Sequence, residues 1–197
     1  MTRKKKQPSS GSSAAARPAP PALAAVAETG SATGGSDSVV ATLSVRDRVR
    51  RRSGQIDILL FRVANESFGI ELGAVEEAID IAPVHHVPEM PAAMLGVVTV
   101  RGVLTSVYSP SAALGLALHD GTSALLFRRG RARVAIVVDD VDDVTTLDLS
   151  ILRDAPVQEA GDGIVLGVVR QRDALLTLVD ADALLAACQA VPLLETA

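Results

Sequence analysis

The chain has 197 residues, and 48% of them are hydrophobic. Residues 1–54 carry ten Lys and Arg against three acids, whereas residues 55–197 carry nine Arg against twenty acids. The acidic larger part lacks the basic face that phosphate neutralisation requires, so nucleic acid is not expected as its main partner. No apolar stretch approaches the roughly eighteen residues of a membrane span, and a single cysteine excludes a disulfide within one chain.

Residues 1–54 are predicted to form a disordered extension, rich in Pro, Ala and Ser at first and basic later. Residues 1–38 have no apolar periodicity, and their composition cannot offset the entropy cost of folding. Residues 39–53 favour at most a short helix with a thin apolar stripe. Prolines interrupt the only apolar run after the basic start, so we expect no secretion signal and a cytoplasmic location.

Residues 55–190 are predicted to form one folded domain, in which short apolar runs are bounded by Gly, Pro or charge. The predicted strands cover residues 58–63, 67–70, 95–100, 103–108, 123–127, 134–138, 141–147, 164–169 and 175–179. Residues 72–79 fit a helical turn or a strand, and 182–189 a last helix. Many short strands at close spacing favour small antiparallel barrels over a βαβ sheet, so we predict a mainly all-β fold.

The two halves of this domain repeat one pattern. Leu59-Leu60-Phe61 returns as Leu125-Leu126-Phe127, and Leu95-Gly96-Val97-Val98 returns as Leu166-Gly167-Val168-Val169. Such self-similarity indicates two copies of one unit, each too small to bury its own core well. We therefore expect a first barrel over about residues 58–115 and a second over about 122–180, packed over a shared core.

The same residues resemble a known family. The stretches Val75-Glu76-Glu77-Ala78-Ile79, Leu95 to Leu104 and Ala135 to Val141 are similar to motifs of the CheW-like domain. That domain occurs in bacterial chemotaxis coupling proteins and in the regulatory part of chemotaxis histidine kinases. The resemblance implies two five-stranded SH3-like barrels and a non-enzymatic adaptor without a cofactor. Its implied partners are a histidine kinase regulatory domain and the cytoplasmic tip of a chemoreceptor.

The resemblance also implies which residues bind partners: Val75, Glu77, Arg101, Gly102 and Val137. For Arg101 two interpretations stay open, because its guanidinium can bind backbone carbonyls at the strand corner or stay exposed for a partner. Gly102 is expected to supply a backbone angle that a side chain disfavours. For Val75 and Glu77 a purely structural interpretation also stays open, with the valine in the core and the glutamate in solvent.

The chain departs from the family where Thr99-Val100 replaces Asn-Leu and where Ser106 to Pro110 replaces Pro-Ile-Val-Asp-Leu. An alternative function is therefore a diverged modulator of a motility pathway with one docking face lost. Asp180 persists in the second copy where the first copy has Ser109.

The sequence gives only weak signs of a metal-binding or catalytic site. The aspartates at 139, 140, 142 and 143 are the densest acidic cluster, and a metal-binding enzyme built on them is a further alternative. Alternation along a strand would send neighbouring carboxylates to opposite faces, which favours a solvated strand end with Val138, Val141 and Val144 facing the core. His85-His86 lies between prolines without other ligands at metal spacing, and Cys188 is expected to be a small core residue. No phosphate loop or nucleophile motif is present, so no enzymatic activity is expected.

Overall fold

The computed structural model describes residues 44–118, 121–155, 163–171 and 174–190. The predicted disorder of residues 1–38 falls outside these ranges. The strands are β1 (Gln55–Val63), β2 (Glu66–Glu71), β3 (Glu77–Asp80), β4 (Met94–Val100), β5 (Val103–Tyr108), β6 (Ser123–Arg129), β7 (Ala132–Val138), β8 (Asp140–Asp148), β9 (Val165–Gln171) and β10 (Ala174–Val179). The helices are α2 (Val45–Arg51), α3 (Ser111–Leu114) and α4 (Ala181–Ala190), with 3₁₀ turns η1 (Leu72–Ala74) and η2 (Leu149–Ile151).

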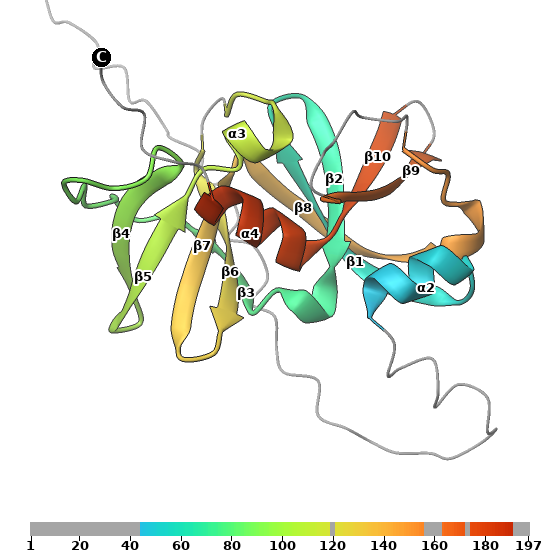
Figure 1. Ribbon diagram of the computed structural model, residues 1–197, viewed down its shortest axis with the longest axis horizontal. Coiled ribbons are helices and arrows are strands. Elements are labelled where there is room, and N and C mark those ends of the chain that lie inside the picture. Colours follow the sequence, from blue (N-terminus) through green and yellow to red (C-terminus); the bar gives the residue numbers. More distant parts are fainter. Residues whose placement is uncertain (1–43, 119–120, 156–162, 172–173, 191–197) are drawn as a thin grey trace, which may run out of the picture.

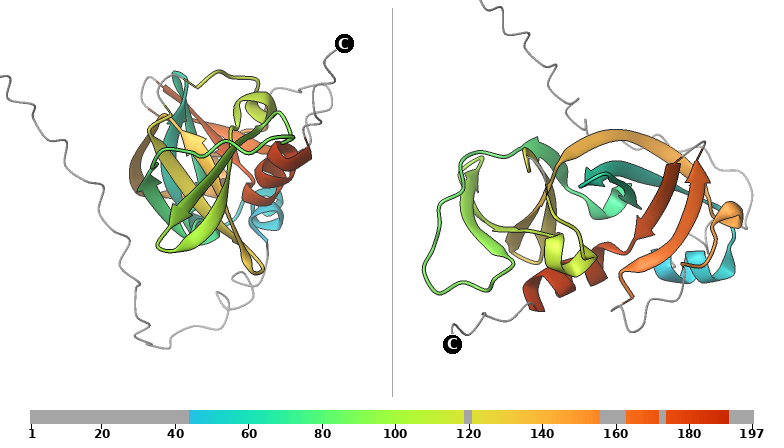
Figure 2. Two further views of the ribbon diagram at one scale, coloured as in Figure 1. Left: turned by 90° about the vertical axis from the view of Figure 1, so that its left-hand side faces the viewer. Right: turned by 90° about the horizontal axis from the view of Figure 1, so that it is seen from above.

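The strands form two five-stranded sheets that curl on themselves and lie side by side (Figures 1 and 2). Sheet A has the order β8-β1-β2-β10-β9, and sheet B has the order β3-β6-β7-β5-β4. Neighbouring strands are antiparallel except for β2 with β10 and β5 with β7, which are parallel. The predicted mainly-β fold of two small barrels is confirmed. No helix of the described residues is long and apolar enough to cross a membrane.

Each sheet takes strands from both halves of the chain. Sheet A joins β1 and β2 to β8, β9 and β10, whereas sheet B joins β3, β4 and β5 to β6 and β7. The barrels therefore do not divide near residues 115–122, where the repeat placed the boundary. The chain crosses between the sheets at η1 and again between β7 and β8. The segment 72–79, predicted as a turn or a strand, contains both, because η1 makes the crossing and β3 begins after it.

Asp139 fixes the second crossing. Its two carboxylate oxygens accept hydrogen bonds from the backbone N–H groups of Ala64, at 2.6 Å, and Gly121, at 3.1 Å. Its own N–H donates to the carbonyl oxygen of Arg62 at 2.9 Å. A carboxylate that binds backbone amides forms strong charge-assisted hydrogen bonds. The aspartate thus ties the start of β8 to the β1–β2 hairpin and to the loop before β6.

Strands β1, β2, β6 and β7 are largely buried on both faces. In β1, Ile56 and Ile58 point into sheet A's own core, while Leu59, Phe61 and Val63 point into a core shared by the two sheets. Because successive strand residues face opposite sides, one strand can serve two cores. The shared core, predicted from the repeat, also includes these residues of β2, β6, β7 and α4: Phe68, Ile70, Leu125, Phe127, Val134, Ile136, Val138, Leu184, Leu185 and Cys188.

The repeated glycines permit a close crossing at each barrel. At Gly96 (φ +146°), a Cβ atom would lie 2.3 Å from the carbonyl oxygen of His85, and at Gly167 it would lie 2.7 Å from that of Arg153. In both places the crossing residue exchanges backbone hydrogen bonds with the strand, His85 with Val97 and Arg153 with Val168. The glycine of the repeated Leu-Gly-Val-Val pattern therefore allows the crossing segment to pack directly on the strand backbone, because no side chain stands between them.

Helix α2 lies against sheet A and extends the folded unit toward the N-terminus (Figure 1). Val45 and Val49 pack on sheet A's core, and the Ser44 side chain caps the helix by accepting a hydrogen bond from the N–H of Asp47. The short helix expected within residues 39–53 is thus present. The folded unit begins before residue 55, because three arginines of this segment bind distant parts of the domain.

Candidate docking site

A surface ion pair stands at the corner of sheet B, where the turn between β4 and β5 approaches β3. The guanidinium of Arg101 donates to the carboxylate of Glu77 at 2.5 Å, and the Arg101 side chain is 69% exposed. Arg101 and Gly102 both have positive φ, +50° and +78°, as a tight two-residue hairpin turn requires. Of the two interpretations of Arg101, the exposed one agrees with the structure, and Gly102 has the backbone angle that was expected.

Glu76 is the centre of a second ion-pair group beside this corner. Its carboxylate accepts hydrogen bonds from Arg133 and, at 2.8 Å, from Arg128. The hydrogen bond from Arg133, together with that from Arg128, holds the pKa of Glu76 below its ordinary value. The sequence pattern gave no sign of this group, because Arg128 and Arg133 reach Glu76 only after β3 pairs with β6.

A groove of about 480 Å³ lies next to Glu76, between η1, the end of β6 and the start of α4. We call it the docking groove. Its lining consists of Gly73, Ala74, Val75, Glu76, Phe127, Arg128, Arg129, Ala181, Asp182 and Leu185. Its large apolar side chains are buried beneath the surface, and exposed charged side chains form the rim. Arg129 pairs with Asp182 at 3.2 Å, which links the tip of β6 to the first turn of α4.

Apolar side chains are also exposed on the β4–β5 and β9–β10 hairpins. Leu104 is 67% exposed and Leu95 is 40% exposed on the first, and Leu175 is 49% exposed on the second. Leu104 and Leu175 occupy equivalent positions in the repeat. We call these surfaces the two hairpin faces. Large apolar side chains in water are typical of surfaces that bind other proteins when they lie close together.

Two of the five residues expected to bind partners are buried. Val75 is 8% exposed and lies under the docking groove, and Val137 is 3% exposed in the core of sheet B. Direct contact between Val137 and a partner is not compatible with this burial, because its side chain packs against the inner strands. Glu77, Arg101 and Gly102 lie together at the corner, so the structure brings three of the five onto one surface.

The acidic cluster is paired rather than convergent. Arg62 contacts Asp140 at 2.5 Å and Asp142 at 3.5 Å, and Asp139 binds backbone amides at the crossing. Among the described residues no group of three or more His, Cys, Asp or Glu side chains is arranged to hold a metal ion. The expectation that Val144 faces the core was wrong, since it is 37% exposed on the edge strand β8.

The histidines and the cysteine singled out in the sequence lie in separate parts of the chain. His85 lies in the loop that crosses β4, and His119 falls outside the described residues. Cys188 is buried in the shared core, as expected, and burial raises the pKa of its thiol to about 11. A thiol with that pKa is almost entirely protonated at neutral pH, which suits packing rather than nucleophilic chemistry.

Comparison with known proteins agrees with this architecture. The CheW-like domain matches residues 57–189, which is most of the chain and all ten strands apart from the start of β1. The chain belongs to the CheW-like domain family. It is 31% identical over 136 residues to the chemotaxis protein CheW of Klebsiella aerogenes, covering 66% of this chain and 81% of that protein. It is 28% identical over 133 residues to the chemotaxis protein CheW of Bacillus subtilis, covering 65% and 85%.

Among solved structures, the chain is similar to the scaffolding protein TtCheW from Thermoanaerobacter tengcongensis, with a TM-score of 0.57 and 19% identity. The match covers 64% of this chain and 85% of that one. At this identity the likeness establishes the fold. Helix α2 precedes the residues that match the CheW-like domain family.

Proposed function

We propose that the protein is a non-enzymatic adaptor that couples chemoreceptors to a histidine kinase. The observation that carries the proposal is the pair of hairpin faces, in which the exposed leucines Leu104 and Leu175 occupy the same place in the repeat. A scaffold that carries these faces and a separate groove can hold two kinds of partner at a fixed spacing. The shared core supports this use, because it joins both faces into one packed unit.

The hairpin faces are proposed to contact the regulatory domain of the kinase. That domain belongs to the same family, so the two proteins can meet through similar surfaces of two-stranded β-sheet. Leu104 lies near the β4–β5 turn and Leu95 at the opposite end of β4, and both are exposed, which gives the first face an apolar character. This composition suits a modest, reversible protein interface.

The docking groove and the neighbouring Glu77–Arg101 pair are proposed to receive the cytoplasmic tip of a chemoreceptor. The small residues Gly73, Ala74 and Ala181 line the groove above the buried side chains of Val75, Phe127 and Leu185, so a helical segment can approach closely. The rim carries both signs of charge, so a partner's charged side chains can exchange with the intramolecular pairs. Arg101 is well placed for such exchange because more than two thirds of its side chain is exposed.

A diverged modulator with one docking face lost remains the second candidate. Ser109 stands where the repeat places Asp180 in the other half. The Asp180 carboxylate caps α4 and binds Arg46, whereas the hydroxyl of Ser109 contacts only Ser111 among the described residues. The segment after β5 is therefore held less firmly than its counterpart after β10.

Binding assays with the full chain test the proposal. The probes are the regulatory domain of a chemotaxis histidine kinase and a chemoreceptor cytoplasmic fragment from the same genome. We expect Leu104→Glu to weaken kinase binding at least about tenfold, because it places a charge at the centre of an apolar face. Arg101→Ala and Glu77→Lys should weaken receptor binding instead.

Ala112→Glu is the matched control, since it adds the same charge at an exposed position of α3. It should leave both affinities unchanged. If the unsubstituted chain binds neither probe, the coupling function is rejected. If it binds only one of the two, the modulator with a lost face becomes the better description.

A further inference from the structure

We propose that Arg46 and Arg48 of helix α2 are positioning residues for the docking groove, each holding one of its two walls. The use of the groove by a receptor rests on the proposed function, but the coupling between α2 and the groove walls does not. Helix α2 precedes residues 57–189, so the two arginines lie outside the residues that match the family.

Arg46 holds the wall made by α4. Its guanidinium contacts the Asp180 carboxylate at 3.1 Å and donates to the carbonyl oxygen of Gly163 at 2.8 Å. Asp180 immediately precedes α4, and its other carboxylate oxygen accepts a hydrogen bond from the N–H of Ala183 at 2.8 Å. The Asp180 side chain is only 10% exposed. One carboxylate therefore ties α2 to the first turn of α4, which lines the groove through Ala181, Asp182 and Leu185.

Arg48 holds the opposite wall. It donates to the carboxylate of Glu71 at 3.1 Å and to the carbonyl oxygen of Gln55 at 2.8 Å. Glu71 is the last residue of β2 and directly precedes η1, whose Gly73 and Ala74 line the groove. The Arg48 side chain is 16% exposed, so its charge depends on Glu71 for compensation. Its position sets where β2 ends and η1 begins.

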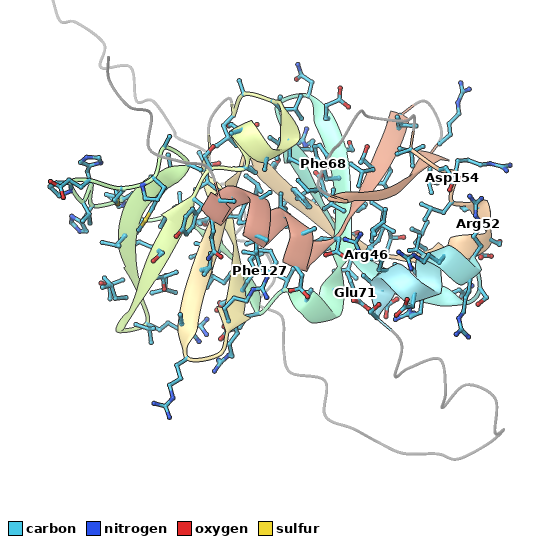
Figure 3. All side chains as sticks on the ribbon, viewed as in Figure 1. Arg46, Arg52, Phe68, Glu71, Phe127 and Asp154 are labelled. Atoms are coloured by element: carbon cyan, nitrogen blue, oxygen red, sulfur yellow. The ribbon has the colours of Figure 1, made fainter. Side chains whose placement is uncertain are left out.

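Helix α2 can hold the groove walls in place because the helix is packed firmly on sheet A. Val45 and Val49, which flank Arg46 and Arg48 in the sequence, both pack on sheet A's core. Figure 3 shows Arg46 and Glu71 toward the middle of the molecule, whereas Arg52 and Asp154 lie at the right-hand edge. A bidentate guanidinium fork holds its acceptors in a more definite geometry than a single contact does.

Arg52 supplies a matched control within the same segment. It donates to the carbonyl oxygen of Leu152 at 2.9 Å and pairs with Asp154, and its side chain is 39% exposed against 37% for Arg46. Neither of its partners lines the groove. Arg50 is exposed on α2. Replacing Arg50 and Arg52 together removes the same charge as replacing Arg46 and Arg48, without touching the groove walls.

Amide hydrogen exchange in the full chain tests the coupling directly. The reporters are the N–H groups of Val75 and Glu76 in one wall, bonded to Leu72 and Leu126, and those of Ala183 and Leu184 in the other, both bonded to Asp180. In Arg46→Met/Arg48→Met we expect their exchange to rise about tenfold, while strands β6 and β7 keep their protection. In Arg50→Met/Arg52→Met the four amides should be unchanged.

Arg46→Lys/Arg48→Lys keeps both charges but loses the forks, so it should give an intermediate, equally local increase. This variant also carries the test if the methionine variant does not fold. The proposal is overturned if the four amides do not respond in either variant. It is also overturned if exchange rises equally throughout the domain, because the arginines would then only stabilise the fold.

Binding separates this inference from the proposed function. Arg46→Met/Arg48→Met should weaken binding of the chemoreceptor fragment about fivefold and leave binding of the kinase regulatory domain unchanged. Weakened receptor binding without any change at the four amides would contradict positioning. If the unsubstituted chain binds no receptor fragment, the receptor part of the proposed function fails, whereas the exchange result still decides whether α2 positions the walls.

Discussion

The two barrels descend from one repeated pattern but fill and close their interiors differently. Sheet A's own core contains mostly Leu and Ile: Ile56, Ile58, Leu147, Leu149, Leu152, Val169, Leu176 and Leu178. Sheet B's own core contains mostly Val and Ala: Val98, Val100, Val107, Ala124, Leu126, Ala135 and Val137. Helix α2 covers the first through Val45 and Val49, whereas the second packs against Ile79, Ile81, Val84 and Leu118 from its own half-buried segments.

This difference teaches how a small barrel obtains enough buried apolar surface. Larger side chains need an additional layer to exclude water from the barrel end, and α2 supplies it for sheet A. Sheet B, with smaller side chains, has no such helix among the described residues, and Arg101 at its far corner is exposed. One barrel is thus shielded by the extension, and the other presents a charged corner.

The largest effect on the free energy of unfolding should come from large-to-small substitutions in the core of each sheet. Leu178→Ala is expected to lower the free energy of unfolding by about 2–5 kcal/mol, because Leu178 is 1% exposed and the change leaves a cavity. Val107→Ala, at a fully buried position of sheet B, should cost less because fewer carbon atoms are removed. Urea unfolding measures both. Equal costs would contradict the distinction between a large-residue core and a small-residue core.

A smaller effect is expected at the exposed corner of sheet B. Arg101→Asn creates an Asn-Gly turn, which favours positive φ at both central residues. We expect stability to rise by up to about 1 kcal/mol, since an exposed ion pair contributes little and a strained backbone angle is relieved. Receptor binding should nevertheless fall. Thermal unfolding and binding measured on the same sample would show the two properties moving in opposite directions; a joint loss would mean that Arg101 acts through stability.

The smallest effect concerns acid. Because the Arg133 hydrogen bond lowers the pKa of Glu76 below its ordinary 4.5, the folded state holds the ionised form more firmly than the unfolded chain does. This contribution is present at neutral pH and is lost as the pH falls below that ordinary value. Glu76→Gln should therefore flatten the loss of stability on acidification, measured by denaturant unfolding across this range. Glu66→Gln, at an exposed hairpin position, should leave the profile unchanged.

The sequence predicted the shared core because Leu59-Leu60-Phe61 and its copy pack symmetrically. It did not predict that each sheet takes strands from both halves of the chain. Self-similarity shows which segments are alike, but it does not show which strands pair in a sheet. The same limit applies to Arg46, whose partner Asp180 lies 134 residues away. Val137 was assigned to a partner surface by resemblance alone, and the alternation along β7 turns it inward. Glu77 and Arg101 came from the same resemblance, and the pairing of sheet B brings them together.

The crossings at Gly96 and Gly167 have a consequence for assembly. An uncovered edge strand has unpaired backbone groups to which a strand of another chain can bind. Repeated addition of this kind leads to aggregation. Here the residues that cross β4 and β9, His85 and Arg153, already occupy some of those groups. At these two edges a neighbouring molecule has fewer free backbone groups to pair with, so recognition there depends more on side chains. A larger residue at either glycine would expose the strand edge and favour aggregation.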